Sequence, residues 1–282
     1  MIKVEEISFS YTQEPFIENI TFSVDKGEIF GFLGPSGAGK STLQKILIGM
    51  LLDYKGSAKV AGIEVKKHDN SFYEKIGIDF EFPSLYEKLT ARQNLSFFAS
   101  LYQNQTSNIE SLLENVGLTK DGDKLVSDYS KGMKSRLNFI KALVHNPDIL
   151  FLDEPTSGLD PTNSRLMKDM ILELKEKGKT IIITTHNMED ATELCDKVAF
   201  IVDGKIKAMD SPHNLIMKKS ATSIEYSYLQ NGKECSGTCK IDKTGEDNLL
   251  RQLIVEGRLL TIHSKEQSLG DVFMEVTGRR LS

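Results

Sequence analysis

Gly34-Pro35-Ser36-Gly37-Ala38-Gly39-Lys40-Ser41 is the stretch that decides the fold. It follows a short apolar run, Glu28 to Leu33, and Thr42 opens a segment with apolar residues at helical spacing. Glycines followed by Lys-Ser are typical of a phosphate-binding loop (P-loop), in which backbone N–H groups wrap phosphates, a lysine pairs their charge and a hydroxyl holds magnesium. A strand before the loop and a helix after it are what that mechanism needs, so we predict a nucleotide site with Lys40 and Ser41 in the last two roles.

The composition is that of an ordinary globular protein. The chain has 282 residues, of which 39% are hydrophobic and 27% charged, so we expect one main domain with an appendage. A net charge of -5 argues against nucleic acid as a partner, because phosphate binding depends on a surplus of Lys and Arg.

Compartment and cysteine use point to a reducing environment. The longest apolar run, Ile46 to Leu52, is far shorter than the roughly 20 residues that cross a bilayer, and residues 1–6 lack a signal-peptide pattern. We expect a cytoplasmic chain with three free thiols. Cys195 has the spacing of a core residue, and Cys235 and Cys239 lack the partners that a metal site requires.

A second polar motif follows a buried strand. Ile149 to Leu152 is a continuous apolar run, and Asp153 and Glu154 come directly after it. Carboxylates are costly there unless they meet a cation or a reacting molecule. We expect Asp153 to hold magnesium or its waters and Glu154 to polarise the water that attacks the γ-phosphate. The alternative is a solvated acidic loop.

The periodicity predicts an α/β fold with three kinds of segment. Alternating residues from Ile2 to Tyr11 and from Ile20 to Val24 indicate antiparallel strands. Residues 82–146 read as a helical subdomain, in which Thr90 and Gln93 form a capping box. Strands at 149–152 and 180–185 enclose a helix that begins at Asp160-Pro161 and stops at Gly178, which makes a βαβ unit.

The C-terminal part differs in character. Asp203-Gly204 between two apolar runs predicts a hairpin, after which the main domain, residues 1–215, ends. Residues 216–282 predict a small α+β domain with a strand at 223–229, a turn at Asn231-Gly232, a helix around 248–256, a strand at 258–263 and a helix from Ser268.

With these motifs in place, the chain resembles the ABC ATPases. Phe151 to Asp160 is similar to that family's joined Walker B motif and D-loop, and Tyr129 to Met133 is similar to its signature Leu-Ser-Gly-Gly-Gln, keeping Ser130 and Gly132. His186 stands where the family has its switch histidine, and Tyr11 resembles its adenine-stacking aromatic. The resemblance covers about residues 1–215 and implies a P-loop NTPase core with an antiparallel β subdomain and a helical subdomain.

The resemblance also implies a nucleotide-sandwich dimer that binds ATP and Mg²⁺. The implied catalytic residues are Lys40, Glu81, Glu154 and His186, and the implied metal ligands are Ser41, Glu81 and Asp153. The implied nucleotide contacts are Tyr11, the P-loop residues Gly34, Pro35, Ser36, Gly37, Ala38, Gly39, Lys40, Ser41 and Thr42, Asp160 and, on the partner chain, Ser130 and Gly132.

Two positions depart from the family pattern. Glu81 stands where the family commonly has glutamine, and it adds negative charge beside Asp153 and Glu154. Lys131 replaces a signature glycine, so that it either meets the partner's γ-phosphate or points into solvent. Because the other catalytic residues are present, we expect a competent site and a homodimer, with a heterodimer as the alternative.

Two further segments bear on partners. Phe82, Pro83, Leu85 and Tyr86 form an apolar cluster in a region that, in ABC transporters, receives the membrane permease; the alternative is subdomain core. The tail from Leu269 to Gly278 resembles that of ATPases that serve exporters with a separate permease. The resemblance thus implies a peripheral ATPase on the cytoplasmic face of the membrane that powers export. The alternatives are a soluble ABC ATPase acting on nucleic acid or ribosomes and, last, a P-loop kinase.

Overall fold

The computed structural model describes residues 1–104, 106–217, 223–230, 232–265 and 267–278. The chain divides into two compact units, Met1–Met209 and Asp210–Leu281, each of which is described by itself. The expected boundary after residue 215 would cut the helix α8 (Pro212–Met217), which packs against α10 (Leu269–Thr277) in the second unit. The division therefore lies before α8.

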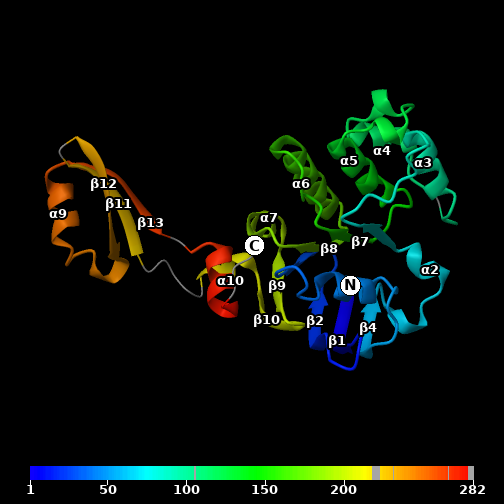
Figure 1. The fold of residues 1–282 in the computed structure, drawn as a ribbon, viewed down its shortest axis with the longest axis horizontal. Coiled ribbons are helices and arrows are strands. Elements are labelled where there is room, and N and C mark those ends of the chain that lie inside the picture. The colour runs from blue at the N-terminus through cyan, green and yellow to red at the C-terminus, as the bar shows by residue number, and fades with distance from the viewer. Residues whose placement is uncertain (105, 218–222, 231, 266, 279–282) are drawn as a thin grey trace. The chain divides into compact units, whose positions relative to one another are not determined.

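A six-stranded sheet forms the centre of the first unit (Figure 1). Its order is β10-β9-β3-β8-β7-β6, and β3, β6, β7, β8 and β9 run parallel. Residues of β3, β7 and β8 are buried almost throughout, as expected of apolar strands covered on both faces. Asp203 and Gly204, with φ of 50° and 70°, make the predicted hairpin. The strands are β3 (Ile29–Leu33), β6 (Ile76–Asp79), β7 (Ile149–Asp153), β8 (Thr180–Thr185), β9 (Lys197–Val202) and β10 (Lys205–Asp210).

An antiparallel sheet of order β2-β1-β4-β5 faces this core. Along β1 (Ile2–Phe9) and β2 (Ile17–Val24) buried and exposed residues alternate, which leaves one face for solvent. β4 (Lys55–Val60) and β5 (Ile63–Glu64) complete the sheet. The predicted pairing of the two N-terminal segments is confirmed, with Ile2 opposite Val24.

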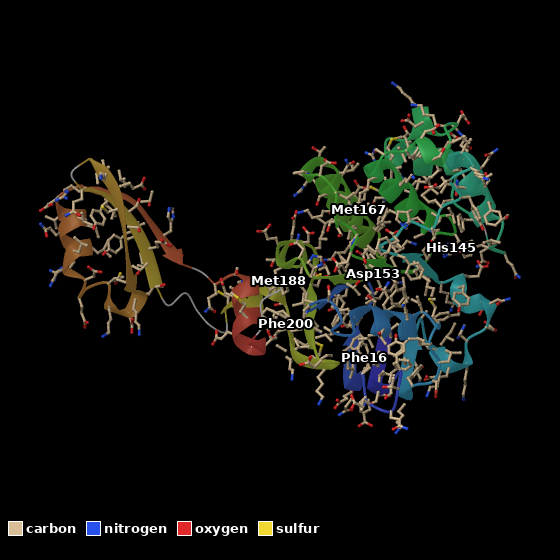
Figure 2. The ribbon with its side chains drawn as sticks, in the orientation of Figure 1. Phe16, His145, Asp153, Met167, Met188 and Phe200 are labelled. Atoms are coloured by element: carbon tan, nitrogen blue, oxygen red, sulfur yellow. The ribbon has the colours of Figure 1, made fainter. Side chains whose placement is uncertain are left out.

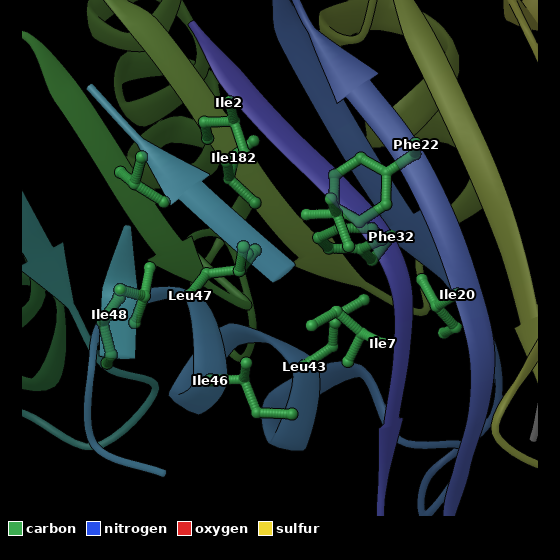
Figure 3. Packing of buried hydrophobic residues seen from close by; sticks show 14 of the residues in the cluster. Ile2, Ile7, Ile20, Phe22, Phe32, Leu43, Ile46, Leu47, Ile48 and Ile182 are labelled. Atoms are coloured by element: carbon green, nitrogen blue, oxygen red, sulfur yellow. The ribbon is translucent and has the colours of Figure 1, made fainter. Parts of the chain in front are cut away.

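One hydrophobic core joins the two sheets through the helix α1 (Lys40–Leu47). Figure 3 shows Leu43, Ile46 and Leu47 of α1 among side chains of both sheets. The rings of Phe22, Phe30 and Phe32 lie 5.2 Å apart and are buried. Because α1 begins at Lys40, this core fixes the helix end that carries the P-loop.

Between β6 and β7 the chain is helical, as predicted. The helices are α3 (Ala91–Ala99), α4 (Ile109–Asn115) and α5 (Lys131–Lys141), and the short α2 (Asn70–Tyr73) precedes β6. The capping box of Thr90 and Gln93 is confirmed. After β7 the chain forms α6 (Pro161–Glu176), with Asp160 as its N-cap, and α7 (Met188–Leu194) follows β8.

The second unit contains a three-stranded sheet of order β12-β11-β13. Its strands are β11 (Ser223–Gln230), β12 (Lys233–Lys240) and β13 (Leu259–Lys265), and Leu250 and Leu253 of α9 (Asn248–Val255) pack on Tyr226 and Tyr228. Gly232 has φ of 73°, as its predicted turn requires, whereas Asn231 lies outside the described residues. Cys195, Cys235 and Cys239 are free thiols. Within the described ranges no helix is long and apolar enough to cross a bilayer.

Candidate nucleotide site

The P-loop connects β3 to α1 and turns tightly at its two outer glycines. A Cβ on Gly34 would lie 2.1 Å from the carbonyl oxygen of Ile201, so only glycine fits against the neighbouring strand. Gly39 has φ of 107°, a left-handed conformation that favours glycine. The loop therefore ends at the N-terminus of α1, where free N–H groups and the helix dipole attract phosphate.

Lys40 is buried and folds back over its own loop. Its Nζ donates to the carbonyl oxygens of Gly34 at 2.7 Å and Pro35 at 3.1 Å. Burial lowers the pKa of Lys40, and the carboxylates of Glu154, Asp153 and Glu81 oppose this shift. The ammonium group is thus held among acids, at the point where a phosphate would compete for it.

The acid that ends β7 and the acid that follows it are oriented by the two threonines that end β8. Thr184 donates its hydroxyl to Asp153, and Thr185 donates to Glu154 Oε2 at 3.0 Å. Burial raises the pKa of Asp153, the Thr184 hydrogen bond opposes the shift, and Glu154 adds to it. A half-buried carboxylate of this kind is stabilised when a cation is bound beside it.

His186 contacts the acid assigned to water activation. Its Nδ1 lies 2.8 Å from Glu154 Oε1, and because a carboxylate only accepts, Nδ1 carries the hydrogen. Glu154 has φ of 50°, and its N–H donates to Thr184 O at 2.9 Å. Such a left-handed backbone at a non-glycine residue is costly and is characteristic of functional sites.

A cavity of about 220 Å³ brings most of the predicted residues together. The parallel strands β3, β6, β7 and β8 all end at this edge of the sheet, where α/β proteins bind ligands. Asp153 is labelled at this edge in Figure 2. The lining residues are Phe16, Ser36, Gly37, Gly39, Lys40, Ser41, Thr42, Glu81, Asp153, Glu154 and His186.

Tyr11 lies beside this cavity and is 56% exposed. Its hydroxyl is 3.0 Å from Thr42 Oγ1, and its ring makes edge contacts with Phe9 and Phe16 at 4.7 and 5.4 Å between centroids. An exposed aromatic ring fixed next to the P-loop can stack on a base.

Ser130, Gly132 and Asp160 do not line this cavity. Ser130 is exposed at the start of α5, where its hydroxyl accepts from Met133 N at 3.3 Å. Asp160 is exposed and accepts from the N–H groups of Thr162 and Asn163. The structure thus separates these three residues from the chain's own P-loop.

Comparison with known proteins decides the family. The family model described as ABC transporter matches residues 17–157. The chain belongs to the ABC transporter family.

Relatives of this ABC transporter chain extend over its full length. It is 48% identical to a fluoroquinolones export ATP-binding protein of Mycobacterium tuberculosis, over 100% of this chain and 95% of the relative. It is 36% identical to the Nod factor export ATP-binding protein I of Rhizobium meliloti, over 99% and 89% of the two chains. A solved ATP-binding subunit of an ABC transporter is similar with a TM-score of 0.70 and 29% identity, over 77% of this chain and 92% of that one. The chain is an ATPase that powers transport.

The ABC ATPase site has a donor set that suits Mg²⁺. Ser41, Glu81 and Asp153 supply one hydroxyl and two carboxylates to a single cavity, and oxygen ligands of this kind bind magnesium together with phosphate oxygens. Among the residues that the structure describes, no three His, Cys, Asp or Glu side chains are grouped to hold a metal by themselves.

Three residues of the ABC ATPase site escaped the sequence reasoning. Phe16 lies directly before β2 and carried no motif, although it lines the cavity. Thr184 and Thr185 read as ordinary strand residues, but their hydroxyls orient both acids. The signal that could have found the threonines is their place directly before His186, at the end of a buried parallel strand.

Proposed function

We propose that the chain hydrolyses MgATP as a nucleotide-sandwich dimer at the cytoplasmic face of the membrane and drives export through a separate permease. The dimer is proposed because the predicted nucleotide contacts of one chain lie in two separate places. Lys40, Asp153, Glu154 and His186 line one cavity, whereas Ser130, which is exposed, and Gly132, which is half-buried, lie outside it. A second chain would bring these two residues to the nucleotide.

Within its own cavity the chain supplies charge, orientation and a base. The P-loop N–H groups and Lys40 hold the β- and γ-phosphates, and Tyr11 stacks on adenine. Glu154 takes a proton from the attacking water, while His186 and Thr185 keep its carboxylate in place at 2.8 and 3.0 Å. Ser41, Asp153 and Glu81 would hold Mg²⁺, which neutralises phosphate charge when bound.

Exposed aromatic side chains support the permease as a partner. Phe82 is 78% exposed, Tyr86 is 50% exposed and Phe97 is 40% exposed. The Tyr86 and Phe97 rings lie 5.0 Å apart in an edge contact. Exposed apolar clusters of this kind mark protein contacts. Export is favoured because the relatives named above are ATP-binding proteins of export systems.

A mixing experiment tests the shared site. Lys40→Ala disables a chain's own P-loop, and Ser130→Arg blocks the surface that it offers to the partner, so each purified variant alone should lack ATPase activity. A mixture should recover activity, because mixed dimers retain one site with both halves intact. Variants that stay inactive together, or a Ser130→Arg chain with wild-type turnover, would refute the sandwich dimer.

Co-purification tests the transport assignment. We expect a membrane protein with several spans to stay with the tagged chain in detergent, and the substitution Phe82→Asp to release it by placing a charge in the contact. Retention of ribosomes or DNA instead of a membrane protein would favour the soluble alternative.

A further inference from the structure

Asp79, Asn138 and Lys141 form a polar cluster (the Asp79 cluster), in which Asp79 and Asn138 are buried and Lys141 is half-buried. Asp79 ends β6 and is 6% exposed, and Asn138 on α5 is 2% exposed. The Asn138 amide donates to Asp79 Oδ1 and, at 3.3 Å, to Phe80 O. Its oxygen accepts from Lys141 Nζ at 2.7 Å.

The Asp79 cluster also holds the segment that follows Glu81. Asn138 Oδ1 accepts from Ser84 N at 3.3 Å, and Lys141 Nζ donates to Ser84 O at 3.2 Å. Lys141 lies over the ring of Phe98 on α3, 5.0 Å from its centroid. Asn138 and Lys141 of α5 therefore hold the segment 79–84 at both of its ends, by hydrogen bonds to residues 79 and 80 and to residue 84.

The place of these contacts in the chain gives them their importance. The helical region leaves the sheet through residues 80–90 and returns to it through α5 and the turn before β7. These are its two covalent links to the sheet, and the Asp79 cluster ties one link to the other. α5 begins directly after Ser130, and the segment 80–90 includes Glu81. If the helical region moves relative to the sheet, these hydrogen bonds must either break or move with it.

A cavity joins the Asp79 cluster to the catalytic acids. It has a volume of about 280 Å³, and its wall includes Asp79 and Asn138 as well as Asp153, Glu154 and Lys131. Asp79 and Asn138 therefore share a cavity wall with the catalytic acids without lining the P-loop cavity itself.

We propose that Asp79 and Asn138 are positioning residues that hold α5 at one setting against the Glu81 segment, so that Ser130 and Gly132 meet the partner's nucleotide in the geometry for hydrolysis. This inference rests on the sandwich dimer proposed above. A buried amide bonded to a carboxyl group is directional, whereas apolar packing at the same place would allow the helix to slide.

The test separates positioning from stability. Asp79→Val removes one acceptor of the Asn138 amide, and Asn138→Leu removes the amide that donates to Asp79, and we expect kcat for ATP to fall about tenfold in each variant. The affinity of the chain's own P-loop for MgATP, measured on dilute protein, should stay within about twofold. Asp79→Asn keeps an oxygen that accepts from Asn138, so its kcat should stay within about threefold of wild type.

The double variant Asp79→Val/Asn138→Leu decides between the two roles. Replacing both partners by apolar groups leaves neither of the two unpaired, so the free energy of unfolding should recover in part; Ser84 N and Lys141 Nζ still lose Asn138 Oδ1. The positioning role predicts that kcat nevertheless stays about tenfold low. Recovery of kcat together with stability, or wild-type kcat in both single variants, would overturn the proposal.

Thr180→Val is the matched control. Thr180 is buried at the opposite end of β8, where its hydroxyl accepts from Gly27 N at 3.0 Å. The substitution should destabilise the fold to a similar degree and leave kcat unchanged.

Hydrogen exchange tests the Asp79 cluster without reference to ATP hydrolysis. In the single variants the amides of residues 80–90 and of α5 should exchange faster than in wild type, while those of α1 should not change. Equal exchange in all segments would refute the cluster's role. A wild-type chain that fails to hydrolyse ATP as a dimer would refute the proposed function instead, and the exchange data would still decide the cluster.

Discussion

The P-loop cavity and the signature segment of the same chain differ in how firmly their side chains are held. In the cavity, Lys40 has two carbonyl partners and Glu154, only 11% exposed, has two donors. At the signature segment, Ser130 and Lys131 are exposed, and Ser130 contacts only backbone of its own helix turn among the hydrogen bonds described. One half of the site is preorganised, and the other half is presented to solvent.

This difference indicates that the two halves of the site have different roles. We expect the cavity to bind phosphate by itself, because the P-loop N–H groups lie at the start of α1 and Lys40 lies beside them. The position of the signature segment depends on the helical region to which it belongs. The Asp79 cluster in turn holds that region against the sheet. Substitutions in the cavity should therefore affect chemistry, and substitutions at the signature segment should affect assembly of the site.

The largest expected effect is that of Glu154→Gln. The amide can still accept from Thr185, but it cannot take the proton of the attacking water, so ATP hydrolysis should fall by about 10² to 10⁴. ATP should still bind, and the ATP-bound dimer should accumulate on size-exclusion chromatography. Glu176→Gln, an exposed change at the end of α6, is the control. Normal hydrolysis by Glu154→Gln without dimer accumulation would remove Glu154 from its role.

The next effect concerns stability and pH at the link between the two halves. Burial raises the pKa of Asp79 to about 7, Lys141 and Asn138 oppose the shift, and Asp153 adds to it. The charged groups around the same cavity are Glu81, Lys131, Lys134, Asp153 and Glu154. Because the folded chain keeps a proton on Asp79 that the unfolded chain loses above about pH 4, this group stabilises the fold at low pH.

The expected result is a stability difference that changes with pH. Between about pH 4 and pH 7, the free energy of unfolding of wild type should fall relative to Asp79→Asn by about 1.4 kcal/mol per pH unit, and it should level off above pH 7. Urea unfolding of both proteins at pH 5, 6, 7 and 8 measures this slope. A difference that is constant across the series would show that Asp79 is ionised throughout.

Local patterns predicted more of the molecule than long-range pairs did. The P-loop between strand and helix, the Thr90–Gln93 capping box and the Asp160-Pro161 helix start are all set by neighbours within a few residues, and all three are confirmed. The expected β3, β7 and β8 follow from continuous apolar runs, which only a sheet covered on both faces accommodates.

Contacts between distant residues could not be predicted in this way. Asp79 and Asn138 are 59 positions apart, and each looked like an ordinary polar residue at the end of a strand or on a helix. Phe16 carried no motif, and the boundary before α8 depends on its packing with α10 near the C-terminus. The assignment of Ser130 and Gly132 to the partner's nucleotide stays a prediction, because it concerns a second chain.

A smaller effect is expected for Lys131→Gly at the signature segment. Lys131 is exposed, and its Nζ lies so close to the D-loop that a Cβ on Gly158 would meet it at 2.0 Å. If the ammonium group turns to the partner's γ-phosphate in the dimer, its loss should raise KM for ATP by up to about tenfold and leave ADP binding unchanged. ATPase assays at low and high salt measure this, because a charge contact weakens with ionic strength. An unchanged KM would mean that Lys131 only points into solvent.

The smallest effect is expected for Glu81→Gln in the cavity half. Glu81 lines the same cavity as Asp153 and Glu154, and a third carboxylate there increases the attraction for a divalent cation. Removing this exposed charge should raise the Mg²⁺ concentration at half-maximal ATPase activity by about fivefold or less, since one charge pair in a hydrated site contributes about 1 kcal/mol. A Mg²⁺ titration at saturating ATP measures the shift, with the exposed Glu114→Gln on α4 as the control. An unchanged metal dependence would assign Glu81 to water or to the 80–90 segment instead, and the cavity would then hold its cation through Ser41 and Asp153.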